Sequence, residues 1–330
     1  MSFYSGSKNN FCVKRMQEAA CIFYDELDST AKTKAVFHFL DGERMFWYYP
    51  PLNRHGLPLR DMSEKLRKLA FNLLETGLSS QAFHQTLQII ENELILKELE
   101  ARQDIKTFVR DPELYYFSIF GNPKKKDLWG WRVEGHHVSI HFSIWSEKII
   151  SVTPLFLGAN PAEVKDGDKA GLRILKNRED LAFELINSMS KHQLESAIIY
   201  KNTPKDIITY NSSKVSVPVV EGISWDELKI SQRELLKSLI VEYVTQVTPE
   251  LAKSKLDYLA TNTLRSVKFG WAGGVQLGEA YYYRIHGGSL FIELDNYQSG
   301  ANHVHSVWRD IENDFAQDVL REHLLTYHVL

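Results

Sequence analysis

The sequence predicts an α+β protein in which helices pack against an antiparallel β-sheet, as one compact unit spanning residues 1–330. Apolar residues recur at helical spacing through an N-terminal part, about residues 1–105, and through a helical insert, about 176–265. Aromatic and β-branched runs separated by short turns form a strand-rich core, about 106–160 and 266–310. Hydrophobic residues make up 44% of the chain, which is enough for a large core. We identify no internal repeat and no linker, so we expect a single domain.

The N-terminal part is expected to begin with a helix over residues 12–32, where apolar positions follow a period near 3.6. Asp41-Gly42 stands between two apolar runs, residues 35–40 and 45–49, and this dipeptide favours a tight hairpin turn. The further helices are expected at 61–104 (interrupted at 76–80, with Ser79 or Ser80 as the cap), 179–190, 191–196, 224–245 (with a Ser224–Glu227 capping box), 249–265 and 311–325. The further strands are expected at 114–120, 129–133, 136–145, 148–156, 267–276, 280–286 and 290–295.

Charge and cysteine content exclude several classes of protein. A formal net charge of -3 gives no basic surface for nucleic acid. The two cysteines, Cys12 and Cys21, exclude a disulfide scaffold and a cysteine-rich metal site. No apolar stretch approaches the ~18 residues of a membrane span, and the N-terminus lacks a signal-peptide pattern. We therefore expect a cytoplasmic protein with no membrane partner; its oligomeric state is left open.

Five of the twelve histidines fall in two short strings far apart in the chain, 135–141 and 302–306. Imidazole is the commonest metal ligand in proteins, so the two strings predict a site for a divalent transition metal. Imidazole ligands suit zinc, copper and iron, and the sequence does not choose among these metals. The five histidines are His136, His137, His141, His303 and His305.

Alternation along strands indicates which of these rings meet. If residues 136–145 form a strand, His137 and His141 share one face and His136 lies on the other. If residues 302–306 are extended, His303 and His305 also share a face, and two such pairs could surround one ion. We therefore expect His137, His303 and His305 as ligands, and His136 as a further ligand or a proton-transfer group.

A hairpin just before the second string adds carboxylates. A two-residue turn at Gly287-Gly288 would set Arg284, Glu293 and Asp295 on one polar face. Asp295 or Glu293 could then complete the site or orient a histidine ligand. This expectation depends on the strand register, because a slip by one residue reverses the face of every side chain.

Several strings resemble the bacterial and fungal family catalogued as domain of unknown function 3500, in family order from about residue 35 onward. The resemblance implies a shared fold and no established reaction. The family usually has Asn where this chain has His141. The resemblance therefore makes His136 and His137 stronger candidates for the site than His141. The matching strings are Arg110–Pro112, Trp129–Arg132, Gly135–His137, Thr153-Pro154, Gly158–Ala162, Tyr282–Ile285, Glu293–Asn296 and Ala301–Asp310.

Four arginines and one asparagine are candidates for binding a substrate. A guanidinium group matches a carboxylate or phosphate with two parallel hydrogen bonds, so an anionic substrate is one interpretation. Ordinary ion pairing is the alternative, since acidic residues are neighbours in the sequence. The candidates are Arg110, Arg132, Arg284, Arg309 and Asn302.

The function that these patterns favour is a metal-dependent enzyme acting on a small, anionic or neutral substrate through a histidine-rich site. His136, Asp295 and Glu293 are its candidate catalytic residues. Hydrolysis and oxidation both remain open, because a metal with an open coordination position can activate water or bind O₂. A non-catalytic protein that binds a metal or a ligand is the alternative. An interaction scaffold without a metal is a third interpretation.

Overall fold

The computed structural model describes residues 9–105, 107–217 and 219–317 of the chain. The strands in this part are β1 (Val36–Phe37), β2 (Leu57–Pro58), β3 (Tyr116–Gly121), β4 (Leu128–Gly135), β5 (Val138–Trp145), β6 (Lys148–Ser151), β7 (Leu155–Ala159), β8 (Ile198–Tyr200), β9 (Ile223–Ser224), β10 (Lys268–Gly273), β11 (Tyr281–Gly287), β12 (Leu290–Asn296) and β13 (Val304–Asp310). The helices are α1 (Asn9–Glu26), α2 (Ser29–Ala35), α3 (Glu64–Gly77), α4 (Ser80–Arg102), α5 (Lys176–Asn187), α6 (Lys191–Ala197), α7 (Ile230–Val244), α8 (Pro249–Asn262) and α9 (Gln298–Ala301). Short 3-10 helices are η1 (Gly42–Met45), η2 (Leu59–Asp61), η3 (Trp225–Glu227), η4 (Leu264–Ser266) and η5 (Asp314–Ala316).

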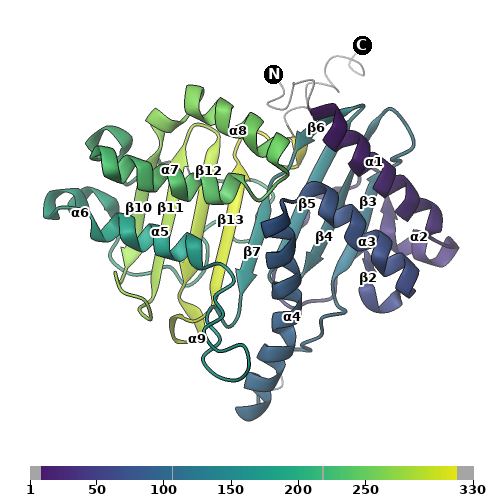
Figure 1. Ribbon diagram of the computed structural model, residues 1–330, viewed down its shortest axis with the longest axis horizontal. Helices are drawn as coiled ribbons and strands as arrows, with labels where there is room; N and C mark the ends of the chain where they lie inside the picture. Colours follow the sequence, from purple (N-terminus) through teal and green to yellow (C-terminus); the bar gives the residue numbers. More distant parts are fainter. Residues whose placement is uncertain (1–8, 106, 218, 318–330) are drawn as a thin grey trace.

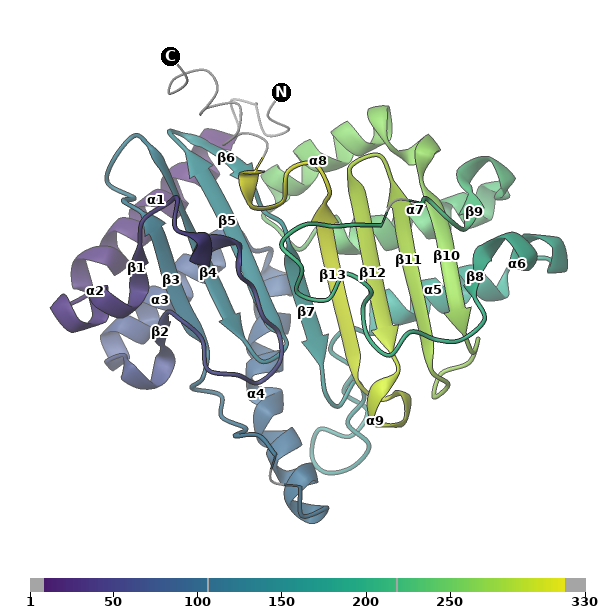
Figure 2. The same cartoon turned by 180° about the vertical axis from the view of Figure 1, so that it is seen from behind.

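The described strands join into one mostly antiparallel sheet in the order β1-β3-β4-β5-β7-β13-β12-β11-β10-β8. β2, β6 and β9 pair with β3, β5 and β10 beside this path. The long helices lie on one face of the sheet (Figure 1), and two long loops cross its other face (Figure 2). The prediction of an α+β fold with helices packed on an antiparallel sheet is therefore confirmed.

Each face of the sheet has its own apolar core. On the helix face, alternate residues of β12 such as Leu290, Ile292 and Leu294 pack under the helices. On the loop face, a smaller cluster buries Trp47 and Tyr49 from the crossing loop against Phe156 of β7. Tyr49 and Phe156 stack with ring centroids 4.4 Å apart. The loops on this face are thus packed parts of the molecule.

The sheet consists of two halves with the same succession of elements, contrary to our expectation of no repeat. The first half runs α1-α2-β1, β2-η2-α3-α4 and β3-β4-β5-β7, and the second runs α5-α6-β8, β9-η3-α7-α8 and β10-β11-β12-β13. β7 and β13 pair antiparallel at the centre, so the strand order of one half mirrors that of the other. The element order therefore indicates an internal duplication about a pseudo-two-fold axis near the Leu155–Trp308 pair.

The hydrogen-bond register repeats along with the elements. Arg132 pairs with His141 across β4 and β5, and Arg284 pairs with Glu293 across β11 and β12. Each of these hairpins turns at a two-residue connection that follows a glycine, Gly135 or Gly287. The repeat is hidden in the sequence because few side chains other than these arginines and glycines are shared.

The hairpin predicted for residues 35–49 is wrong. α2 ends at Ala35, and β1 pairs in parallel with β3. The Asp41 side chain accepts a hydrogen bond of 2.9 Å from the backbone N–H of Glu43, so Asp41-Gly42 begins η1 instead of closing a β-turn. The helix predicted over 12–32 is broken because Asp28 caps the separate helix α2. Residues 46–49 then cross the loop face.

The polar face predicted for the hairpin of β11 and β12 is confirmed. Tyr282 lies opposite Asp295, and Arg284 lies opposite Glu293. The turn is Gly288-Ser289 instead of Gly287-Gly288, which shifts the pairing without reversing any face. The predicted Ser224–Glu227 capping box begins η3, and α7 starts later, at Ile230. Of the helix predicted at 311–325, the residues up to 317 contain only η5 and its flanks; residues 318–325 lie outside the described part.

Candidate metal centre

His136 and His137 form the two-residue turn between β4 and β5. Our prediction that they continue a strand is wrong, and His137 adopts a left-handed backbone conformation with φ of 62°. Because they lie in a turn, the two rings do not point to opposite faces; they stack with centroids 3.7 Å apart. Both imidazoles therefore lie on the same side of the turn, at the edge of the sheet where β7 ends and β13 begins.

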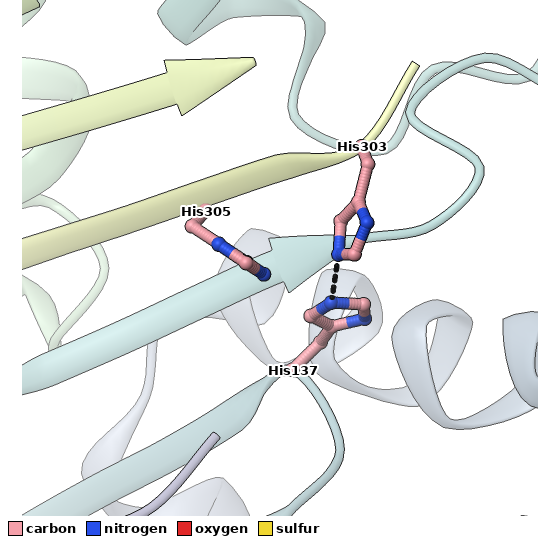
Figure 3. A group of neighbouring side chains, drawn as sticks. All are labelled: His137, His303 and His305. Carbon is pink, nitrogen blue, oxygen red and sulfur yellow. Dashed lines mark hydrogen bonds between the residues drawn. The ribbon is translucent and has the colours of Figure 1, made fainter. Parts of the chain in front are cut away.

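The structure brings His137, His303 and His305 together (Figure 3). His137 comes from the turn, His303 directly precedes β13, and His305 lies in β13. The Nε2 atoms of His137 and His303 are 2.8 Å apart, and one ligand nitrogen from each of the three residues lies within 4.8 Å of the others. Their exposed fractions are 2%, 8% and 4%. Three imidazoles that are buried and converge in this way match the ligand set of a tetrahedral metal site with one further position.

Two carboxylates hold the outer nitrogen of His305. Its Nδ1 lies 2.8 Å from Asp206 Oδ1 and 3.4 Å from Asp295 Oδ1. Burial alone would lower the pKa of His305, but the hydrogen bond to Asp206 and the nearby carboxylate of Asp295 raise it to about 9. A histidine held at Nδ1 by carboxylates presents Nε2 to a metal, which is the usual outer-sphere arrangement of zinc ligands. Asp295 thus lies beside a histidine of the cluster, and the role predicted for it stays a prediction.

A further carboxylate approaches the cluster from the helix face. Glu93 of α4 hydrogen-bonds His136 Nδ1, and both residues are buried. Burial raises the pKa of Glu93 to about 8 and lowers the pKa of His136 well below its usual value. The connected side chains therefore run from Glu93 in the helix layer, past the end of β7 and β13, to Asp206 in the loop layer.

A pocket of about 330 Å³ opens beside this cluster, and Glu93 and His136 form part of its wall. Arg54 and Arg60 also line it, but Arg60 pairs with Asp111 of the same wall and Arg54 donates to backbone carbonyls such as that of Tyr48. Leu52 contributes an apolar side chain. Small ligands can therefore approach the cluster from the side of Glu93 and His136.

Backbone contacts fix the ligand-bearing segments. The N–H of His303 donates a 2.9 Å hydrogen bond to Asn296 Oδ1. The N–H of Gly158 in β7 donates one of 2.8 Å to the carbonyl of His137. The equivalent bond in the second half runs from the N–H of Ile311 to the carbonyl of Ser289, also 2.8 Å, although that turn carries Gly288-Ser289 instead of two histidines. Both halves of the sheet thus contain this hairpin turn and its backbone hydrogen bond, and only the turn of the first half carries histidines.

Substituting Gly158 is expected to disturb the site without removing a ligand. A Cβ atom at Gly158 would lie 2.8 Å from His137 Cδ2 and 2.8 Å from the carbonyl oxygen of Val304, so Gly158→Ala must displace the ring or the strand. We expect zinc affinity to fall roughly 10–100-fold, as for changes that misorient a ligand. Competition with a fluorescent chelator measures this loss. Gly42→Ala is the control, because a Cβ atom there would meet only Phe46 Cε2, at 3.9 Å, and the backbone is not left-handed; equal affinities in the two variants would contradict the expectation.

Each predicted substrate-binding arginine is bonded to a carboxylate. Arg110 binds Glu100 through two nitrogens, at 2.8 and 2.7 Å, and its third nitrogen faces His136. The other three pairs are Arg132–Glu43 at 2.7 Å, Arg284–Glu221 at 2.5 Å and Arg309–Asp314 at 2.6 Å. Arg110 is thus the one of the four that the structure brings to the histidine cluster. A substrate role for any of the four stays a prediction.

Three further sequence candidates bond to other parts of the structure. Glu293 accepts hydrogen bonds from the N–H groups of Ile208 and Thr209 and from Tyr282, so it anchors the loop that carries Asp206. Asn302 bonds both backbone groups of Glu163. His141 lies 2.8 Å from the Ser139 hydroxyl and outside the three groups of candidate metal ligands found in the described residues.

Two residues of the cluster were missed from the sequence, Glu93 and Asp206. Glu93 had a weak signal, because a carboxylate within the apolar run of a long helix must find a polar partner when it is buried. Asp206 had none, since it lies in an irregular loop between β8 and β9.

The fold and the histidine cluster together define an α+β protein with a candidate metal centre. The chain belongs to the family described as protein of unknown function DUF3500, whose model matches residues 10–317. Comparison with curated proteins and with solved structures found no match. In the described residues, no helix has the length and apolar character to cross a membrane. The predicted cytoplasmic location stays a prediction.

Proposed function

We propose that this protein is a metal-dependent enzyme, with His137, His303 and His305 binding a divalent transition metal. The observation that carries the proposal is the convergence of three buried imidazoles, one of them held at its outer nitrogen by two carboxylates. Histidine nitrogens suit zinc, copper or iron. Such a metal, when bound, supplies a Lewis acid or a site for O₂, so hydrolysis and oxidation both fit.

The adjoining pocket favours a catalytic role for the metal and not a structural one. A structural zinc site takes its four ligands from the protein, whereas a catalytic site keeps a position for water or substrate. Here three imidazoles converge, and the wall of the adjoining pocket includes His136 and Glu93, which could move a proton to or from a bound substrate. The volume of this pocket, about 330 Å³, suits a small substrate.

Non-catalytic metal binding is the second candidate function. It is favoured by the burial of all three imidazoles, none of which is among the residues that line the pocket. An exchangeable ligand would separate the two functions. If azide changes the visible spectrum of the cobalt-substituted protein, an open position exists and catalysis is favoured; an unchanged spectrum favours a structural or storage role.

Metal analysis of His303→Ala tests the proposed centre. Protein purified without a nickel column, loaded with zinc and dialysed is expected to retain at least one equivalent, and His303→Ala is expected to lose most of the metal bound at this centre. His286→Ala is the matched control, because His286 is equally buried in the same sheet and lies outside the candidate groups. Less than ~0.2 equivalents of metal in the wild type, after addition of zinc, copper or iron, would refute the proposal. Full occupancy in His303→Ala would refute this ligand set.

A further inference from the structure

We propose that the protein has a second metal position, formed by Glu93 and His136 with the free ring nitrogen of His137, on the pocket side of the first. This inference deepens the proposed function and rests on it. It makes the site a two-metal centre in which His137 lies between the ions.

The ligand atoms for a second ion are already grouped. One atom each from Glu93, His136 and His137 lies within 4.8 Å of the others. Glu93 Oε1 and His136 Nδ1 are in direct contact, and the rings of His136 and His137 are 3.7 Å apart. An ion held by Glu93 and His136 would therefore be a close neighbour of an ion held by His137, His303 and His305.

His137 can serve both positions as an imidazolate: its ring proton is released to solvent when the metals bind, and each ring nitrogen then offers one lone pair to one ion. Its Nε2 faces His303 Nε2 at 2.8 Å and so belongs to the first position (Figure 3). Nδ1 is then the atom available to the second position.

The charges around Glu93 favour a cation there. Buried carboxylates in proteins are paired with cations or coordinate metals. The cationic neighbour of Glu93 is Arg110, but two nitrogens of Arg110 bind Glu100. The third nitrogen lies 3.3 Å from His136 Nδ1, the atom that also contacts Glu93. The bidentate partner of Arg110 is therefore Glu100, and Glu93, on losing its proton, would bind a metal ion together with His136.

The remaining candidate group, Asp206, Asp295 and His305, is not a third position. None of these three residues lines the pocket, and both carboxylates lie at Nδ1 of His305, which leaves Nε2 of that ring for the first ion. Glu93 and His136, in contrast, line the pocket, so the second ion is the one that would meet the substrate.

Metal stoichiometry with zinc tests the second position. We expect two equivalents per chain in the wild type and one in both Glu93→Gln and His136→Ala. Glu93→Gln keeps the size of the side chain and removes its charge. Glu91→Gln, on the same helix but exposed, is the control and should keep two equivalents. Circular dichroism of each variant shows whether it is folded.

Electron paramagnetic resonance of the copper(II)-loaded protein gives a second readout. Two neighbouring copper ions should give a spin-coupled signal in the wild type, and Glu93→Gln should give the signal of an isolated ion. One equivalent in the wild type would overturn this inference and leave the proposed function standing, whereas no metal would overturn both. Two equivalents retained in Glu93→Gln and in His136→Ala would place the second ion elsewhere and also overturn the inference.

Discussion

Zinc is expected to raise the thermal unfolding midpoint of the wild-type protein by several degrees. A ligand that binds only the folded state stabilises it by RT ln(1 + [L]/Kd), about 4 kcal/mol when zinc is in thousand-fold excess over Kd. The folded state holds three imidazoles together, while in the unfolded chain His137 is 166 positions away from His303, so the binding free energy becomes stability. Differential scanning calorimetry with and without zinc measures the shift.

His305→Ala is expected to abolish most of this stabilisation. The substitution removes a ligand and leaves Asp206 and Asp295 without the imidazole that they hold. His286→Ala removes a buried imidazole of the same sheet outside the cluster and should respond to zinc as the wild type does. A zinc-dependent shift of equal size in His305→Ala would show that zinc acts at another site.

Trp308→Ala is expected to lower the free energy of unfolding by about 3–5 kcal/mol, the range for truncation of a buried aromatic residue. Trp308 is fully buried in β13 and lies opposite Leu155 of β7, where the two halves of the sheet meet. Natural domains are stable by about 5–15 kcal/mol, so this loss is a large share of the total. Urea unfolding followed by far-ultraviolet circular dichroism measures it as a lower midpoint.

The matched variant for this prediction is Trp225→Ala, whose side chain is only partly buried at the start of η3. Trp225→Ala should lower the free energy of unfolding clearly less than Trp308→Ala does, because the truncated side chain buried less apolar surface. A midpoint for Trp308→Ala equal to that of the wild type would mean that the contact between the halves adds little to stability.

The sequence predicted the parts of the fold that local patterns determine. The hairpin of β11 and β12 was predicted with its correct faces, because alternation and a glycine-rich turn act within fifteen residues or so of chain. The hairpin predicted at Asp41-Gly42 failed because Asp41 bonds the N–H of Glu43 and begins a 3-10 helix. An aspartate can end a strand or begin a helix, and packing elsewhere decides between them.

Local patterns also predicted only the part of the candidate site that lies within one strand. His303 and His305 were paired by their spacing, but His136 and His137 were taken as strand residues. A histidine with positive φ is uncommon, and the turn became evident only from the pairing of Gly135 with Val138. Glu93 and Asp206 reach the cluster from a helix and from a loop, so their position depends on tertiary packing.

The internal duplication was missed because it is preserved in register and element order and hardly at all in side chains. Its clearest residue-level traces are Gly56 with Gly222 and Gly121 with Gly273, all with positive φ. These pairs occupy matching places beside β2 and β9 and at the ends of β3 and β10. Only one of the two equivalent turns carries histidines, which is consistent with a single metal centre at one end of the central strand pair.

The most direct test of the metal centre is anomalous diffraction at the zinc absorption edge from crystals of the zinc-loaded wild-type protein. We predict a peak about 2.0–2.1 Å from Nε2 of each of His137, His303 and His305, with Asp206 still bonded to Nδ1 of His305. A map with no peak at these three nitrogens, or with its strongest peak at exposed histidines, would contradict the account.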